Sequence, residues 1–201
     1  MRNWNYDSTQ NCYVVTDCPL NCDGDGANGR AGGVACYVPR GSGLPSLDLL
    51  ANAGSPGNWW GIACDSGGNP FIQQASDPVQ GAYISTTSYQ VRFKPDGVTP
   101  RPTNDPDRYL DAVAVPFIVV PGAFVRGVPG IVLGCKCEVE YQGKVVAAMV
   151  GDTGPDFGEF SVNVCKQFDP SANCHGTSIN SGVTVRIWPG VAFPGYPLQK
   201  S

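Results

Sequence analysis

The sequence predicts a mainly β domain that closes into a small barrel, with disulfide-stapled loops and one or two short helices. Glycine contributes 26 of the 201 residues and proline 18, whereas charged residues make up only 15 %. Long exposed helices need Glu, Lys, Arg, Ala and Leu in quantity, so this composition disfavours helical bundles and coiled coils. The hydrophobic fraction of 42 % is enough to bury a core, and the apolar runs are as short as strands.

We expect a single catalytic domain over residues 1–201, because no linker separates two cores and no repeat of fixed period is visible. Residues 1–43 hold four of the nine cysteines and lack a long periodicity. We therefore expect them to wrap the core under disulfides. The barrel core is expected within residues 59–201.

The elements before this core and at its start are short. Residues 46–53 predict a helix that is capped by Ser46 and ends before Gly54. Residues 59–95 predict strands broken by turns. Residues 94–107 carry four prolines and predict a loop.

The later elements have stronger signals. The near-continuous apolar run 113–120 is typical of a buried barrel strand. Further strands are expected at 131–141, 144–150 and 183–188, with a tight hairpin at Gln142-Gly143. Residues 159–168 fit both the alternation of a strand and the spacing of a helix, and the pattern leaves both open.

The nine cysteines indicate an oxidising compartment, and their odd number leaves at least one outside intramolecular pairs. Eight cysteines allow 105 pairings, so no connectivity follows. Zinc is the alternative, but the sequence has no CxxC pair and one histidine, so we expect no metal site. No apolar run approaches the roughly 18 residues of a membrane span. We expect a secreted protein without a membrane partner.

Charge and motifs exclude several other classes of function. The formal net charge is −4 and no basic stripe is visible, so we expect no nucleic-acid partner. The stretch GDGANG at 24–29 matches GxGxxG, but no apolar strand precedes it and Asp25 would repel a pyrophosphate. An EF-hand would need Gly in place of Asn28 and Glu in place of Val34. We therefore expect no cofactor, and we expect a monomer.

The most informative segment is residues 145–164, VVAAMVGDTGPDFGEFSVNV. An apolar strand leads to Asp152 and a Gly-Pro turn, and Glu159 follows seven residues later. Glycoside hydrolysis needs two such carboxylates, one to protonate the leaving oxygen and one to activate water or attack the sugar. Spacing alone leaves open that Asp152 caps a turn and Glu159 is solvated. Asp156, within the same loop, is a further candidate.

Three ordered blocks of sequence resemble the chitosanases of glycoside hydrolase family 75. The blocks are Asp17 with Asn21-Cys22-Asp23-Gly24; Trp60-Gly61, Asp65, Gly68-Asn69-Pro70, Gln73, Asp77-Pro78, Gly81 and Tyr83-Ile84-Ser85-Thr86-Thr87-Ser88; and Val115-Pro116-Phe117-Ile118-Val119-Val120-Pro121, Val150-Gly151-Asp152-Thr153-Gly154-Pro155 and Gly158-Glu159-x-Ser161. The resemblance implies a barrel of the double-psi kind and endo-acting, inverting hydrolysis of chitosan. It implies that Asp152 and Glu159 are the catalytic pair, with Glu159 as general acid and Asp152 as general base; the reverse order stays open.

A polycationic substrate would explain why the chain has more acidic than basic residues. Chitosan carries ammonium groups at mildly acidic pH, so carboxylates would attract it. Aromatic rings would lie along sugar faces, and neutral polar groups would bond the sugar or orient the acids. The candidate substrate-binding residues are Asp17, Asp23, Asp25, Asp77, Asp156, Trp59, Trp60, Tyr83, Gln73, Thr86 and Thr87.

Other functions remain open. One is a glycosidase of another polysaccharide, such as cellulose or bacterial wall glycan. Another is a non-catalytic carbohydrate-binding or wall-loosening barrel, which would usually lack one carboxylate. A third is a disulfide-stapled adhesion or inhibitor domain, which would need no acid pair.

Overall fold

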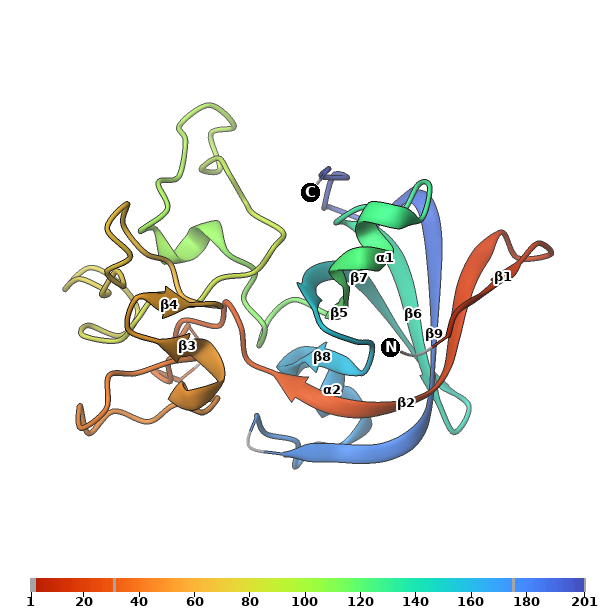
Figure 1. Ribbon diagram of the computed structural model, residues 1–201, viewed down its shortest axis with the longest axis horizontal. Coiled ribbons are helices and arrows are strands. Elements are labelled where there is room, and N and C mark those ends of the chain that lie inside the picture. Colours follow the sequence, from red (N-terminus) through yellow and green to blue (C-terminus); the bar gives the residue numbers. More distant parts are fainter. Residues whose placement is uncertain (1–2, 31, 175, 201) are drawn as a thin grey trace. The chain divides into compact units, whose positions relative to one another are not determined.

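The computed structural model describes residues 3–30, 32–174 and 176–200. The chain forms two compact units. The first unit combines the residues up to Asp23 with those from Val115 onward, and the second unit spans Gly24–Ala114 (Figure 1). The barrel therefore belongs to the first unit alone. Residues 59–114, which we expected to contribute to the barrel core, lie in the second unit.

Among the described residues, six strands close into a mixed barrel in the order β2-β8-β5-β7-β6-β9, with β2 pairing with β9 to complete the ring (Figure 1). A short strand β1 pairs with β2 outside this ring. The predicted mainly β class and the closed barrel are confirmed. The strands are β1 (Asn5–Asp7), β2 (Cys12–Asp23), β5 (Phe117–Pro121), β6 (Cys135–Tyr141), β7 (Lys144–Gly154), β8 (Glu159–Ser161) and β9 (Thr177–Ala192).

Two short helices follow barrel strands without a loop. Helix α1 (Gly122–Gly127) continues from β5, and helix α2 (Val162–Phe168) continues from β8. The two periodicities of residues 159–168 thus belong to two elements, a strand and then a helix. Ser161 divides them, because its side chain accepts a hydrogen bond from the Val164 N–H as an N-cap. No described helix is long and apolar enough to cross a membrane.

The barrel repeats one pairing pattern twice. β5 pairs in parallel with β7, and β8 pairs in parallel with β2. β6 pairs antiparallel with β7, and β9 pairs antiparallel with β2. The strand–helix–strand–strand order of β5, α1, β6 and β7 therefore corresponds to β8, α2, β9 and β2. The sequence shows no repeat because backbone pairing preserves this topology without preserving side chains.

All five residues of strand β5 are buried. Its neighbours β7 and β8 cover both of its edges. A strand buried on both faces needs apolar residues throughout, which explains the second half of the run at 113–120. The strand expected there begins only at Phe117, and residues 113–116 precede it, with Ala114 exposed. The predicted hairpin is also confirmed: Tyr141 pairs with Lys144, and Gln142 and Gly143 have φ of 50° and 80°, as a two-residue type I′ turn requires.

The second unit consists mainly of loops. Its regular elements are η1 (Leu50–Ala53), β3 (Gly54–Ser55), β4 (Asn58–Trp59) and η2 (Pro106–Arg108). The helix expected at 46–53 is only the 3-10 turn η1, and the strands expected at 59–95 are, apart from β4, isolated bridges such as Ile62–Ser85. The turns between these segments leave too few consecutive residues for longer ladders.

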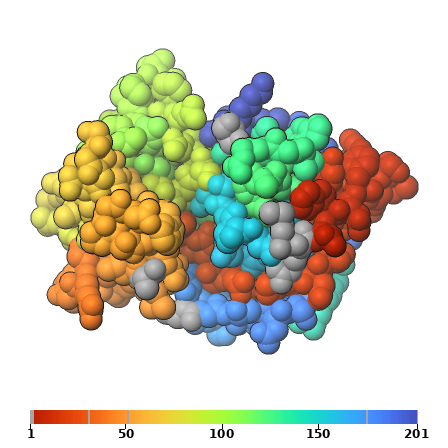
Figure 2. Space-filling view, in the orientation of Figure 1, coloured from red at the N-terminus to blue at the C-terminus, as the bar shows by residue number. Residues whose placement is uncertain are grey.

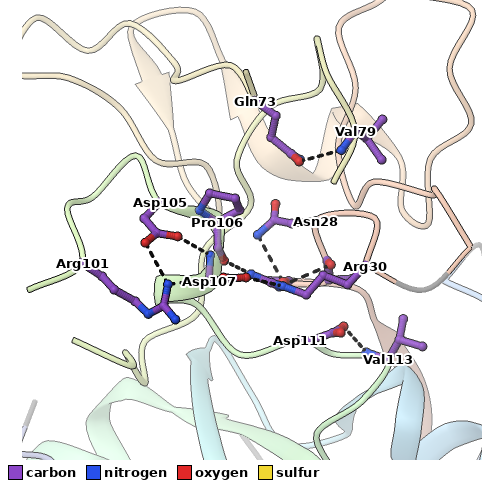
Figure 3. Close-up of polar contacts among 12 residues, drawn as sticks. Asn28, Arg30, Gln73, Val79, Arg101, Asp105, Pro106, Asp107, Asp111 and Val113 are labelled. Atoms are coloured by element: carbon purple, nitrogen blue, oxygen red, sulfur yellow. Dashed lines mark hydrogen bonds and ion pairs between the residues drawn. The ribbon is translucent and has the colours of Figure 1, made fainter. Parts of the chain in front are cut away.

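Polar contacts hold these loops together. Arg30 forms an ion pair with Asp107 at 2.9 Å and donates to the carbonyl oxygens of Gly26 and Pro106 (Figure 3). Arg101 forms a second ion pair with Asp105 at 2.9 Å. In the space-filling view the loops, coloured orange to light green, pack into a continuous surface (Figure 2). These ion pairs add to the backbone hydrogen bonds and isolated bridges that connect the loops of this unit.

The predicted disulfide staples are not found. All nine cysteines lie in the described part of the chain, and no two of their sulfurs are at bonding distance. An S–S bond needs about 2.05 Å between sulfurs, whereas Cys22 and Cys174 are separated by 3.6 Å. The wrapping segment expected at 1–43 is instead divided: β1 and β2 are part of the barrel sheet, and the residues after Asp23 begin the second unit.

Candidate active site

Asp152 lies near the end of β7 and is only 7 % exposed. The register between β5 and β7 shifts just before it: Ile118 pairs with Val150, but Val119 pairs with Asp152. Gly151 is therefore the extra residue of a β-bulge, a feature that re-aims the side chain that follows it. The Thr153 N–H donates to the Asp152 carboxylate at 2.7 Å. Strand, bulge and hydrogen bond together set the position of this carboxylate.

Glu159 is the first residue of β8, on the other side of β5 from β7. Ile118 of β5 pairs antiparallel with Phe160. Continuing this register by one residue places Glu159 opposite Val119, which is also the partner of Asp152. Asp152, Val119 and Glu159 thus form one row across three strands. Adjacent strands are about 4.8 Å apart, so the two acidic residues have backbones about 10 Å apart.

Gly154 leaves space for the Glu159 carboxylate. A Cβ atom at position 154 would lie 3.1 Å from Glu159 Oε2 and 2.9 Å from Val119 Cγ1. Glu159 therefore packs against bare backbone at the end of β7, two residues after Asp152. A side chain at position 154 would compete with it for this space.

Strand β2 extends the row and adds a third carboxylate. Asn21 pairs with Glu159, and Asp23 pairs with Ser161. A carboxylate oxygen of Asp23 lies within 4.8 Å of one of Asp152. The Asn21 N–H donates to the Gly158 carbonyl at 2.9 Å, which ties β2 to the loop before Glu159.

The first unit holds two further predicted residues, each engaged in local structure. Asp17 has a φ of 57° at an irregularity of β2 and accepts a hydrogen bond from the Gly182 N–H at 3.0 Å. Asp156 lies in the loop between β7 and β8 and accepts from the Phe157 N–H at 2.9 Å. Neither belongs to the row that contains Asp152 and Glu159.

Asp25 lies in the second unit, where its carboxylate takes part in a network of polar side chains. Its carboxylate accepts hydrogen bonds from the Tyr37 hydroxyl at 2.7 Å and from Ser85 Oγ at 3.2 Å. The Tyr37 hydroxyl also lies 3.4 Å from Asp48, which is 7 % exposed. Burial, followed by the negative charge of Asp25, raises the pKa of Tyr37 well above its ordinary value. The phenol therefore stays protonated and bridges two carboxylates.

Gln73, Thr86 and Thr87 support the loops of the second unit. Gln73 is buried, donates to the Tyr83 carbonyl at 3.3 Å and accepts from the Val79 N–H at 3.0 Å (Figure 3). Thr87 is buried as well, and its hydroxyl donates to the Tyr89 carbonyl and accepts from the Leu110 N–H. The Thr86 N–H donates to the Gly61 carbonyl at 2.9 Å.

Two of the remaining candidates have local hydrogen-bond partners. Asp77 accepts a hydrogen bond from the Gln74 N–H at 2.7 Å, within a turn. Trp60 is 57 % exposed, and its indole nitrogen donates to the Asn52 carbonyl at 2.7 Å.

Tyr83 and Trp59 line a groove of about 760 Å³ in the second unit. Their ring centroids are 5.7 Å apart at an interplanar angle of 54°. The segment from Val38 to Leu44 also lines this groove. Its mainly apolar lining with two aromatic rings is of the kind that accepts the apolar face of a ligand.

Sequence reasoning missed Asn21 and Ser161 as site residues. Asn21 lies beside Glu159, and its Oδ1 accepts a hydrogen bond from Thr177 Oγ1 at 2.5 Å. Ser161 Oγ accepts from the Phe117 N–H at 3.0 Å and from the Val164 N–H at 3.4 Å. Both stand in the sequence blocks that carry the family resemblance. Their roles depend on strand pairing, which residue spacing alone does not reveal.

Comparisons with known proteins add no assignment: no protein-family model matches the chain, and no curated protein matches it.

Proposed function

We propose that the chain is an endo-acting chitosanase that hydrolyses β-1,4 bonds of chitosan with inversion, using Asp152 and Glu159. The observation that carries this proposal is the row in which these two acidic residues flank Val119 on adjacent strands. Inverting glycosidases hold their carboxyl groups about 6.5–9.5 Å apart so that a water fits between sugar and base. A backbone separation of about 10 Å, two strand spacings, accommodates that distance.

In the proposed reaction Glu159 protonates the glycosidic oxygen as the bond to the anomeric carbon breaks. Asp152 takes a proton from a water that attacks the anomeric carbon from the opposite face. After the reaction Glu159 is ionised and Asp152 is protonated, which is the reverse of the starting state. Proton exchange with solvent then restores the starting state. Asp23, whose carboxylate lies close to that of Asp152, adds negative charge where a cationic sugar would bind.

The repeated pairing of β5 with β7 and of β8 with β2 supports assignment of the barrel to the double-psi kind. In this proposal the groove that contains Trp59 and Tyr83 receives sugar rings, because aromatic faces pack against the apolar faces of sugars. Asp17, Asp25, Asp77, Asp156, Trp60, Gln73, Thr86 and Thr87 stay predicted substrate contacts. We propose a secreted monomer that uses neither metal nor cofactor.

Substitution of each carboxylate tests the proposal. We expect Asp152→Asn and Glu159→Gln each to lower kcat on chitosan by about 10²–10⁴-fold, the usual contribution of one acid or base, with unchanged circular dichroism. Glu138→Gln is the matched control, because Glu138 lies on β6 in an ion pair with Lys136. The control should retain wild-type turnover. A folded variant of either carboxylate with near-wild-type turnover would remove that residue from the pair.

A substrate with a good leaving group separates the two roles. Loss of the general acid matters little when the leaving group needs no proton, so glucosaminides of acidic phenols should restore turnover to Glu159→Gln and not to Asp152→Asn. The reverse pattern would exchange the roles. Product anomers followed by NMR should show inversion. Binding without hydrolysis of chitosan, chitin or cellulose would favour the non-catalytic alternative, and hydrolysis of a different polymer would replace the substrate.

A further inference from the structure

Three cysteine side chains of the first unit lie close together at strand β2, which also carries Asn21 and Asp23. Cys22 lies on β2, Cys165 lies on α2, and Cys174 lies between α2 and β9. Cys22 Sγ and Cys174 Sγ are 3.6 Å apart, and Cys22 also has a side-chain hydrogen bond with Cys165. One sulfur therefore has two thiol neighbours, one from each of two other segments.

Backbone pairing holds this arrangement in place. Cys22 pairs with Phe160 of β8, and Asn21, the residue before it, pairs with Thr177 of β9. Cys165 Sγ lies 3.4 Å from the Phe160 carbonyl and 3.7 Å from the Asn21 carbonyl. The sulfurs thus meet where strands β2, β8 and β9 and helix α2 are already joined, so forming an S–S bond needs only a small movement of the Cys174 segment.

We propose that Cys22, Cys165 and Cys174 form a thiol–disulfide exchange site in which Cys22 bonds to Cys174, with Cys165 as the alternative partner. The oxidant is a small-molecule disulfide such as oxidised glutathione. The Cys22 thiolate attacks one sulfur of the oxidant, which forms a mixed disulfide and releases one glutathione thiolate. The thiolate of Cys174 then attacks Cys22 Sγ, closes the protein disulfide and releases the second glutathione. Two protein thiols lose two protons and two electrons, and the oxidant gains both.

The hydrogen bonds around Cys22 favour it as the attacking group. Donation from Cys165 and then from Cys174 lowers the pKa of Cys22, and the same bond raises the pKa of Cys165. The thiolate is the nucleophile in exchange, so the sulfur with the lowered pKa reacts first. Cys22 is partly exposed and Cys165 is buried, so a small oxidant also reaches Cys22 more easily than Cys165.

Peptide mapping tests the proposal on the full chain. The protein is reduced, freed of reductant, incubated with oxidised glutathione and digested with trypsin without reduction. Cys22 falls in the peptide 3–30, Cys165 in 145–166 and Cys174 in 167–186. We expect a cross-link between 3–30 and 167–186, with a mass loss of two hydrogen atoms. Absence of this cross-link while the three peptides keep reduced thiols would overturn the proposal.

Variants assign the sulfurs, because the peptide 3–30 also contains Cys12 and Cys18. Cys22→Ser should abolish the cross-link, and its persistence in that variant would overturn the proposal. In Cys174→Ala we expect Cys22 to carry glutathione or to join the peptide 145–166; an unmodified Cys22 would count against the exchange site. Cys64→Ser, in the second unit, is the control and should leave the cross-link unchanged. These readouts need no chitosan, so they stand apart from the proposed hydrolysis.

Discussion

The position of Glu159 depends on a single residue without a side chain. Gly154 ends β7, and a Cβ there would meet both Val119 and the Glu159 carboxylate within about 3 Å. No positive φ is involved, so the requirement for glycine is purely one of space. The Gly-Asp-Thr-Gly turn signal in the sequence therefore has a specific cause: its second glycine makes room for the second acid of the pair.

Gly154→Ala should damage activity more than stability. Extra volume at a packed position costs about 1–3 kcal/mol, and displacement of a catalytic group by about 1 Å costs on the order of 10²-fold in rate. We expect a modest fall in the urea midpoint and a fall in kcat of at least about tenfold. Gly127→Ala, at the end of α1 where a Cβ meets nothing within 4 Å, is the control. Equal kcat in both variants would show that Glu159 does not need this space.

At the scale of elements, Ser161 joins three parts of the barrel. It ends β8, caps α2 and accepts the N–H that begins β5. The sequence predicted the hairpin at Gln142-Gly143 correctly because two left-handed residues suffice for that turn. The sequence pattern of residues 159–168 did not distinguish a strand from a helix. The change from one to the other depends on the Ser161 hydroxyl, which also accepts a hydrogen bond from β5, a strand distant in sequence. Local patterns predict local turns, whereas this junction needs a tertiary contact.

Ser161→Ala should destabilise the first unit by about 1–3 kcal/mol, because it leaves two buried N–H groups without their acceptor. Chemical denaturation followed by far-ultraviolet circular dichroism measures the loss. Ser55→Ala, at an exposed position of β3, should change stability by no more than about 0.5 kcal/mol. Stability of Ser161→Ala within that same range would mean that the hydroxyl does not connect these elements.

At the scale of the whole molecule, the chain has a net charge of −4 and is divided into two compact units. The polypeptide leaves the barrel after Asp23 and returns at Val115. Strands β2 and β5 are therefore close in the barrel although about ninety residues of the second unit separate them in sequence. Local sequence patterns do not predict such an arrangement, because they carry information only about segments that are close in the chain.

Added salt should weaken the proposed binding of chitosan. The attraction between a net negative protein and a polycation is screened beyond a Debye length, which falls from about 10 Å at 0.1 M to about 3 Å at 1 M salt. We expect KM for chitosan to rise several-fold across this range, and binding of an uncharged chitin oligosaccharide to change little. A KM that is independent of salt would contradict recognition by charge.

The sequence by itself determined the mainly β class, the hairpin and the proximity of Asp152 and Glu159 along the chain, because alternation, turn residues and short spacing are local properties. Only the tertiary structure decided which strands form the barrel, that Val119 stands between the two acids, and that Asn21 and Asp23 join them from β2. Cysteine number alone predicted disulfide staples, whereas the fold brings Cys22, Cys165 and Cys174 together as thiols. The physical reason is the same in each case: strand pairing and thiol approach depend on where distant segments meet, and the one-dimensional spacing of residues does not contain that information.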